Sequence, residues 1–317
     1  MRTGAAAGHQ GYYHEALYYS SDDELLAVLV PFLTGGPHAG EPTIVALGER
    51  NAALVRSALP PGSGVTYTTG GDVYARPAAA IRSYRRLLTD LVTEGARQIR
   101  IIGELPGSAF GATWDSWARY ESVINHAYDD FPLWSMCAYD RRTTPSAMLA
   151  DVARTHPRTA RADGSHPDSH TYADPVSYLT EARPMRTDPV QLSTPFAELV
   201  DPAPALARQT VRDAGPGRVS PDQVDDLIVA VSEAVTNAMV HGRGPIRMRV
   251  WNGGDRIVVT VTDAGPGPKD PFAGLLAADD TATGGRGLWI TNQSVNSVSY
   301  GRAPDGFTIR LIAGNPD

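Results

Sequence analysis

The sequence predicts two domains of different fold class, an α/β domain followed by an α+β domain. The length of 317 residues is enough for two hydrophobic cores. Strand-like and helix-like segments alternate as far as His156, whereas helices and strands are grouped apart after about Pro195. We therefore expect domains at residues 1–157 and 191–317, joined by a linker at 158–190.

The first half has the pattern of a largely parallel sheet with helices on both faces. The segment 21–33 opens with Ser and Asp and then spaces its leucines and valines as in a helix. Short apolar segments and longer helix-like segments follow in turn. The strand-like segments are TIVAL (43–47), QIRIIGE (98–104) and PLWSMCAYD (132–140), and the helix-like ones are 51–59, 82–95, 116–131 and 145–156, with Pro145 expected in a first turn.

The segment 157–189 is rich in Pro, Ser, Asp and His and has little apolar periodicity, which predicts a linker or a segment draped over the surface. The spacing of His156, His166 and His170 fits no standard zinc pattern, so we expect no metal site in this tract.

The second half predicts an α+β sandwich. Helical patterns cover 202–215, 220–242 and 287–295, with Ser220 expected as the N-cap of the long helix and Pro221 in its first turn. Alternating strands at 245–252 and 256–265 are joined by a Gly-Gly turn, and 296–313 is typical of a hairpin.

Composition limits the function. The net charge of −7 and the pI near 5.6 give no general attraction to nucleic acid or to anionic membranes. We expect a cytoplasmic protein, because the sequence has neither a signal peptide pattern nor a membrane-spanning apolar stretch. The single cysteine, Cys137, excludes an internal disulfide, and its apolar neighbours predict a buried structural thiol. The single lysine, Lys269, excludes a Walker A motif, so any nucleotide site works without a P-loop.

Three motifs in the second half suggest chemistry. Glu233 and Asn237, four residues apart, project from one helix face beside an apolar stripe, although such a pair is also typical of a solvated face. Asp263 ends a buried strand, where its carboxylate can accept a hydrogen bond from an adenine amino group. Glycines after it allow close approach of a flat ligand. The segment GGRGL, 284–288, places glycine amides at a helix N-terminus, a phosphate cradle to which Arg286 adds a charged donor.

In this order and spacing the motifs resemble those of the GHKL superfamily of ATPases and kinases, over about residues 195–313. The resemblance implies that ATP and Mg²⁺ bind here, with Asn237 on the metal, Asp263 on adenine and Glu233 as general base. The remaining nucleotide-binding residues that it implies are Gly265, Gly267, Gly284, Gly285, Arg286, Gly287, Leu288 and Thr308.

Within that superfamily the sequence is most similar to the small anti-sigma serine kinases. A sensor histidine kinase needs a phosphoacceptor histidine on a dimerising hairpin, and the preceding stretch is Pro-rich instead. His241 is expected to be a C-terminal cap residue of the helix or to lie at the edge of the nucleotide pocket, and not to be a phosphoacceptor. A gyrase-like or chaperone-like ATPase is not expected, because its large clamp domains would not fit in 317 residues. The sixteen residues between Gly267 and Gly284 are enough for a short lid. The resemblance implies that the protein sequesters a sigma factor, phosphorylates a serine of a STAS-domain anti-anti-sigma protein and forms a homodimer. A non-catalytic, ATP-responsive binding protein is the alternative.

The first half resembles the MEDS sensory domain over about residues 8–157, through HEALYYSSDDELLAVLVPFL, IIGE, W-x-x-W-x-R-Y-E, INHAY, CAYD and ARTHP. The resemblance implies a RecA-like core without a Walker A motif and a role in sensing or docking. A small-molecule ligand is expected in a pocket whose candidate lining residues, which packing or capping also explains, are His14, Glu104, Trp117, Tyr120, Glu121, Tyr139, Asp140 and His156.

Overall fold

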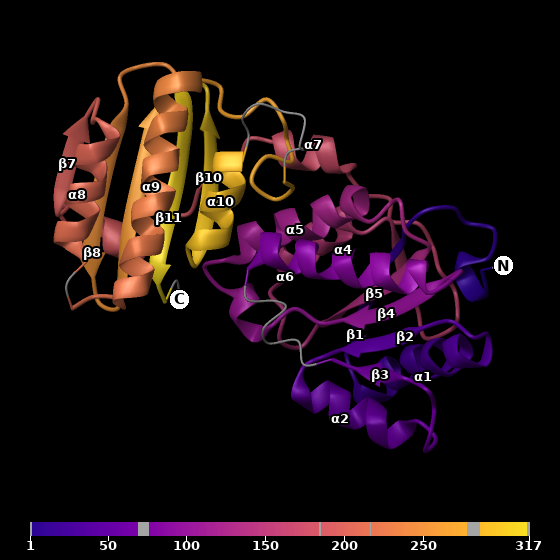
Figure 1. Cartoon of the computed structure of the whole chain (residues 1–317). Helices are drawn as coiled ribbons and strands as arrows, with labels where there is room; N and C mark the ends of the chain where they lie inside the picture. Colours follow the sequence, from indigo (N-terminus) through magenta and orange to yellow (C-terminus); the bar gives the residue numbers. More distant parts are fainter. Residues whose placement is uncertain (1, 69–75, 184, 216, 278–285, 316–317) are drawn as a thin grey trace. The chain divides into compact units, whose positions relative to one another are not determined.

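The computed structural model describes residues 2–68, 76–183, 185–215, 217–277 and 286–315. The chain divides into two compact units (Figure 1). The first consists of Met1–Ala75, Ala79–Phe110 and Trp117–Tyr178, and the second of Arg76–Ala78, Gly111–Ser116 and Leu179–Asp317. The domain and linker boundaries expected from the sequence stay a prediction.

The first unit is built on a six-stranded sheet with the order β3-β2-β4-β5-β1-β6, and every pairing in it is parallel. Its helices cover both faces, which confirms the predicted fold class (Figure 1). The strands are β1 (Tyr13–Tyr19), β2 (Thr43–Ala46), β3 (Thr66–Tyr67), β4 (Ile99–Gly103), β5 (Leu133–Asp140) and β6 (Arg158–Ala160). The helices are α1 (Asp22–His38), α2 (Glu49–Ala58), α4 (Pro77–Thr93), α5 (Trp114–Ala127) and α6 (Ser146–Thr155).

Alternation along the strands sends side chains to two separate layers. Leu17 and Met136 pack with α1 and α2 in one core cluster. Their neighbours in sequence, Ala16 and Cys137, are register partners and point to the opposite face, where α4, α5 and α6 lie (Figure 1). Polar residues on that second face, such as His14, are therefore enclosed between the sheet and its helices.

The sequence pattern missed several elements of the first unit, among them β1, β3, β6 and α7. Strand β1 contains two fully buried polar residues, His14 and Glu15, and so lacks an apolar run. The linker expected at 158–190 contains β6, which pairs in parallel with β1, and the short helix α7 (Pro175–Thr180). Pro145 is the N-cap residue of α6 and does not lie in its first turn.

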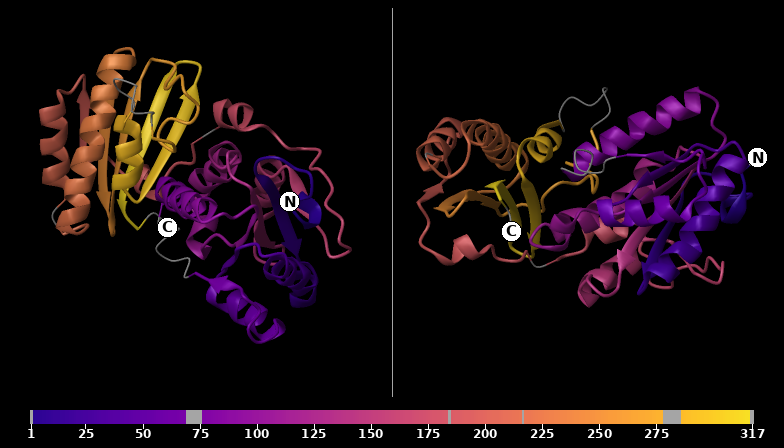
Figure 2. Two further views of the ribbon diagram at one scale, coloured as in Figure 1. Left: turned by 45° about the vertical axis from the view of Figure 1, so that its right-hand side comes forward. Right: turned by 90° about the horizontal axis from the view of Figure 1, so that it is seen from below.

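The second unit has two layers, an antiparallel sheet and the helices on one of its faces (Figures 1 and 2). The sheet has five strands in the order β10-β11-β9-β8-β7, and this arrangement confirms the predicted α+β sandwich. The elements are the 3₁₀ helix η3 (Pro189–Leu192), β7 (Ala197–Val200), α8 (Pro204–Ala214), α9 (Pro221–His241), β8 (Arg247–Gly253), β9 (Arg256–Asp263), α10 (Arg286–Ser294), β10 (Ser297–Ala303) and β11 (Gly306–Gly314).

Helix α9 is the centre of the second core. Ser220 is its N-cap in a capping box with Gln223, and Pro221 occupies the first turn, as the sequence predicts. The predicted apolar stripe is buried, with Ala230 in addition, and the buried residues are Leu227, Ile228, Ala230, Val231, Ala234, Val235 and Ala238. Glu233 and Asn237 lie at the border of this stripe and are half-buried. None of the described helices is long and apolar enough to cross a membrane.

Candidate functional site

Glu233 and Asn237 lie against the start of α10. A β-carbon added at Gly287 would collide with Oε2 of Glu233 and would lie 3.4 Å from Nδ2 of Asn237. Only a glycine therefore allows the first turn of α10 to approach α9 this closely. The structure brings together a carboxylate, an amide and a helix N-terminus whose first amides have no partner within the helix.

The polar ends of Glu233 and Asn237 have no hydrogen bond to any described residue, and Nδ2 of Asn237 is buried. A buried NH₂ donor without a partner is rare and indicates that an acceptor, such as water or a ligand oxygen, completes its environment. The carboxylate of Glu233, one helical turn before Asn237, is likewise able to accept a hydrogen bond from a hydroxyl group. The amide oxygen of Asn237 and the carboxylate oxygens of Glu233 are the kind of hard ligands that Mg²⁺ prefers.

Asp263 lies in a narrow space between two glycines. Its Oδ1 accepts hydrogen bonds from the backbone amides of Gly265 (2.6 Å) and Arg243 (3.2 Å). A β-carbon at Gly242 would lie 2.5 Å from this oxygen, and one at Gly265 would lie 2.6 Å from it. Both hydrogen bonds use Oδ1, so Oδ2 has no hydrogen bond to the described residues and remains available to a donor such as an exocyclic amine.

Gly242 has a role that the sequence pattern did not assign to it. It is the C-cap residue of α9, and His241 is the last residue of the helix and is exposed. Because Gly242 leaves room for the Asp263 carboxylate, it joins the end of α9 to the end of β9. The adjacent Arg243 amide also belongs to this junction.

Gly267 has a φ of +76°, and a β-carbon there would collide with the Phe307 ring. Phe307 is the register partner of Asp263 and belongs to the core cluster beneath the helices. Thr308 therefore lies on the other face of the sheet, where its hydroxyl is 2.8 Å from that of Thr262. Thr308 thus does not share a sheet face with Asp263, and its expected role near adenine stays a prediction.

The second glycine motif lies only partly within the described residues. Gly284 and Gly285 fall outside them, as does part of the expected lid. Arg286 is the exposed first residue of α10. Leu288 is partly buried and packs against the core cluster, so it anchors α10 to the unit.

Gly287→Ala is expected to lower the free energy of unfolding of the second unit by about 1 to 3 kcal/mol, because the added methyl overpacks the α9–α10 contact. Urea unfolding followed by circular dichroism measures it. Gly107→Ala is the matched control, since a β-carbon there meets nothing within 4 Å. Equal or greater stability of the Gly287 variant would contradict the contact.

The residues expected to line one pocket in the first unit do not lie together, and six of the eight fall into two groups. Glu104 and Asp140 lie at the carboxyl ends of β4 and β5, on a cleft of about 1460 Å³. Glu104 accepts hydrogen bonds from the Gly48 amide (2.9 Å) and from Asn51 (2.8 Å), and burial raises its pKa. Clefts outside the carboxyl ends of parallel strands are the usual ligand sites of such sheets. The lining of this cleft also includes the charged residues Arg50 and Arg142, so the cleft suits a polar small molecule.

The second group lies in the interior between the sheet and α5. His14, Glu121, Tyr139 and His156 meet there around Cys137. Burial lowers the pKa of His14 and His156, in the latter to about 4, and raises the pKa of Glu121 to about 7. Cys137, expected as a buried structural thiol, is partly exposed as a residue, and its sulfur lies 3.5 Å from Nε2 of His14 and 3.6 Å from Oε2 of Glu121.

The other residues singled out in the first half lie elsewhere. Trp117 and Tyr120 form an edge-to-face pair with ring centroids 5.4 Å apart. His166 lies 2.7 Å from Glu15, and His170 is exposed. The tract containing His166 and His170 brings no group of metal-binding side chains together within the described ranges, although His156 joins the cluster around Cys137.

Comparison with known families matches each half of the chain separately. A model described as MEDS, the methanogen/methylotroph DcmR sensory domain, matches residues 13–157. A model described as a histidine kinase-like ATPase domain matches residues 196–313. No curated protein matches the chain.

Similar solved structures include the RsbU and RsbW domains of Rv1364c from Mycobacterium tuberculosis, with 20% identity, a TM-score of 0.28 and coverage of 38% of this chain and 32% of that one. The histidine kinase domain of the blue-light activated kinase of Erythrobacter litoralis has 21% identity, a TM-score of 0.25 and coverage of 36% and 61%. The histidine kinase domain of the E. coli osmosensor EnvZ has 19% identity, a TM-score of 0.24 and coverage of 39% and 92%. The chain thus spans less than two thirds of the first two structures.

The two family matches agree with the parallel α/β architecture of the first unit and with the antiparallel, helix-covered sheet of the second. Residues 13–157 form a MEDS sensory domain, and residues 196–313 form a histidine kinase-like ATPase domain of the GHKL type.

Proposed function

We propose that the second domain binds Mg²⁺-ATP and that the protein is an anti-sigma factor with serine kinase activity. It holds a sigma factor and phosphorylates a serine of a STAS-domain anti-anti-sigma protein. The observation that carries the proposal is the convergence of Glu233 and Asn237, neither hydrogen-bonded within the described residues, on Gly287.

The residues present fit a metal-nucleotide complex. Asn237 would hold Mg²⁺, the α10 N-terminus with Arg286 would face the phosphates, and Asp263 would bind the adenine amino group. Bound Mg²⁺ supplies charge neutralisation on the phosphates. Gly265 and Gly267 keep the space next to the base free of β-carbons.

Glu233 is the group that acts on the acceptor. Its carboxylate, one helical turn before Asn237, orients the serine hydroxyl of the partner and accepts its proton as the oxygen attacks the γ-phosphorus and ADP leaves. Phosphoryl transfer depends mainly on such positioning and on neutralisation of charge, so the domain does not need a P-loop lysine.

The segment before α8 supports a serine kinase over a histidine kinase. Between β6 and α8, the helices in the described residues are α7, with six residues, and η3, with four. No helical hairpin able to carry a phosphoacceptor histidine is found in that described segment.

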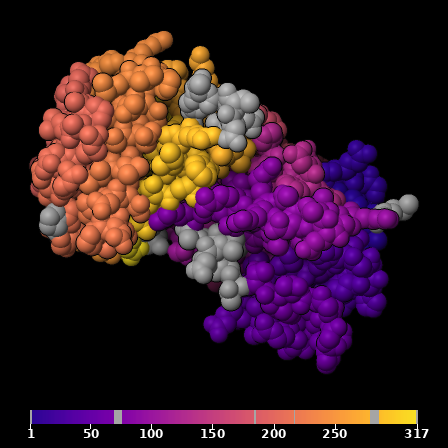
Figure 3. Space-filling view, in the orientation of Figure 1, coloured from indigo at the N-terminus to yellow at the C-terminus, as the bar shows by residue number. Residues whose placement is uncertain are grey.

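The surface of α8 and α9 supports a protein partner. Met239 and Val240 are adjacent on α9 and are 55% and 67% exposed, and Leu206 on α8 is 50% exposed. Figure 3 shows this helical surface in orange on the second unit. If these side chains together form one apolar patch, such a patch is typical of a surface that a partner covers.

We also propose that the first domain modulates sigma-factor binding and phosphorylation by the second domain. It does so by binding a small polar molecule in the cleft lined by Glu104 and Asp140. The cleft carries both carboxylates and guanidinium groups, so a ligand with donors and acceptors would be held there.

The test is incubation of the full chain with radiolabelled ATP, Mg²⁺ and a STAS-domain protein encoded near it. We expect label on the STAS protein that survives acid, as phosphoserine does, and that disappears when the acceptor serine is replaced by alanine. Acid-labile label on the chain itself would indicate a histidine kinase. ATP binding without any transfer would overturn the kinase proposal and leave an ATP-responsive binding protein.

A further inference from the structure

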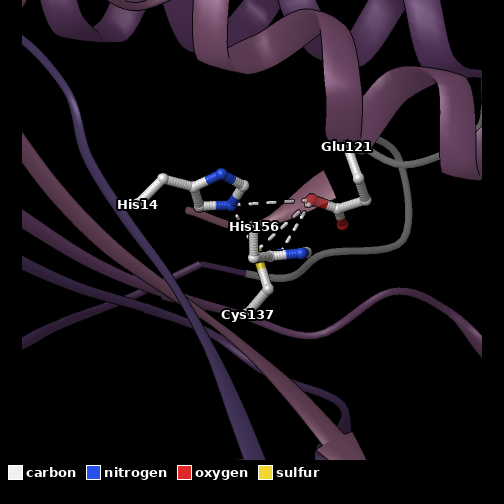
Figure 4. Close-up of side chains that lie close together, drawn as sticks. All are labelled: His14, Glu121, Cys137 and His156. Carbon is white, nitrogen blue, oxygen red and sulfur yellow. Dashed lines mark hydrogen bonds and ion pairs between the residues drawn. The ribbon is translucent and has the colours of Figure 1, made fainter. Parts of the chain in front are cut away.

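Four potential metal ligands from four different elements of the first unit point toward one centre (Figure 4). His14 comes from β1, Glu121 from α5, Cys137 from β5, and His156 follows α6. His14 and His156 are fully buried, and Glu121 is 1% exposed. A carboxylate in such a place is costly unless a positive charge or hydrogen bonds compensate it.

Four of the six distances between the donor atoms match the edges of a tetrahedron around a metal ion. Oε2 of Glu121 lies 3.7 Å from Nε2 of His14, 3.5 Å from Nε2 of His156 and 3.6 Å from Sγ of Cys137. Nε2 of His14 lies 3.5 Å from Sγ of Cys137, and all four ligand atoms are within 4.8 Å of one another. Bond lengths of zinc to N, O and S give tetrahedron edges of about 3.3 to 3.8 Å.

Both imidazoles are held so that Nε2 carries a free electron pair directed at the centre. Nδ1 of His156 lies 2.9 Å from the Val152 carbonyl, which can only accept, so Nδ1 holds the proton. Nε2 of His156 is buried and has no hydrogen-bond partner. Carbonyl partners at Nδ1 are the usual supports of metal-binding histidines.

His14 is oriented through Asn125. The Asn125 amide nitrogen donates to the backbone carbonyls of Glu121, Ser122 and Thr155, which fixes its oxygen toward His14. That oxygen lies 2.9 Å from Nδ1 of His14, which must therefore donate. The remaining ring nitrogen, Nε2, faces the centre.

Glu121 is held in the same way. The Tyr139 hydroxyl donates to Oε1 at 3.0 Å and leaves Oε2 directed at the two histidines and the thiol. Each ligand other than Cys137 thus has a second partner that fixes its direction, as in metal sites of high affinity.

We propose that His14, Glu121, Cys137 and His156 bind one Zn²⁺ ion in the MEDS domain. Binding releases the thiol proton to solvent, and the thiolate and the carboxylate balance the two charges of the metal. The protein fills all four positions, so the ion is structural and links β1, α5, β5 and the end of α6.

The test uses the full chain purified without an affinity tag. We expect about one zinc per chain by elemental analysis after dialysis, and replacement by Co²⁺ should give a thiolate-to-cobalt charge-transfer band and the intense visible bands of four-coordinate cobalt. Because Cys137 is the only cysteine, a thiolate band can come from no other residue. Removal of the metal by a chelator is expected to lower the Tm of the first unit by several degrees.

Cys137→Ser is expected to lose the charge-transfer band and most of the zinc, and His170→Ala, at an exposed histidine outside the cluster, to retain both. Asn237→Ala should retain both as well, which separates this site from the proposed Mg²⁺-ATP site. If the wild-type chain takes up neither zinc nor cobalt at this stoichiometry, the proposal is wrong. Full retention of zinc by a folded Cys137→Ser variant would also overturn the ligand set.

Discussion

Replacing Asn237 by alanine is expected to weaken Mg²⁺-dependent ATP binding by at least about 100-fold, which corresponds to about 2.7 kcal/mol. The buried end of this amide has no hydrogen-bond partner in the described part of the chain, so its loss takes little from the fold. It does remove the proposed metal ligand, and a hard cation such as Mg²⁺ binds through very few protein oxygens. Isothermal titration with ATP in the presence of Mg²⁺, and again with excess chelator, measures the effect.

The chain offers a matched control one residue away. Thr236 is exposed on α9, and its hydroxyl donates to the Ser232 carbonyl of the same helix. Thr236→Ala should bind Mg²⁺-ATP as the wild type does. If Asn237→Ala also binds normally, or if its loss of affinity persists in the chelator, Asn237 is not the metal ligand.

Glu233→Gln is expected to slow phosphoryl transfer to the STAS partner by about 10² to 10⁴-fold, the usual contribution of a general base. Gln keeps the shape of the side chain beside Gly287 but cannot accept the hydroxyl proton. ATP affinity should change by less than about threefold, because Glu233 acts on the acceptor and not on the nucleotide. Initial rates at saturating ATP, with affinity measured separately, distinguish the two effects.

Asp222→Asn is the control for Glu233→Gln. Asp222 is exposed in the first turn of the same helix, eleven residues before Glu233. Its variant should transfer phosphate at the wild-type rate. Undiminished transfer by Glu233→Gln would remove Glu233 from catalysis while leaving the nucleotide site in place.

The parts of the fold that follow from local sequence could be predicted well. Helix α9 has both an N-cap signal at Ser220 and a long apolar stripe, and the structure contains both. Strand β1 was missed because His14 and Glu15 interrupt its apolar pattern, and their burial depends on distant partners. Trp134 donates a hydrogen bond to Glu15 at 2.7 Å, and a contact between residues so far apart in the sequence cannot be predicted from a local pattern.

The position of Thr308 depends on strand register, which sequence alone does not give. The motif places Thr308 close to the first glycine motif, but side chains alternate along a strand. Phe307 pairs with Asp263, so these two side chains share a sheet face. Thr308, the next residue along the strand, points to the opposite face.

The sequence placed His14, Glu121 and His156 in one expected pocket, but it did not predict that Cys137 joins them as a potential metal ligand. Spacing rules for zinc sites recognise ligands that are close in sequence, whereas His14 and His156 come from opposite ends of the first domain. The order of the parallel strands, with β1 next to β5, brings them together.

The two walls of the proposed nucleotide site differ in how firmly the protein holds them. Helix α9 contributes seven buried residues to the core, so displacing it would expose a large apolar area to water. Among the described residues of α10, only Thr291 is buried. Local opening starts where few buried contacts must break. A nucleotide that contacts both helices would therefore move α10 more easily than α9. Binding would change the position of α10 relative to a helix that stays fixed in the core.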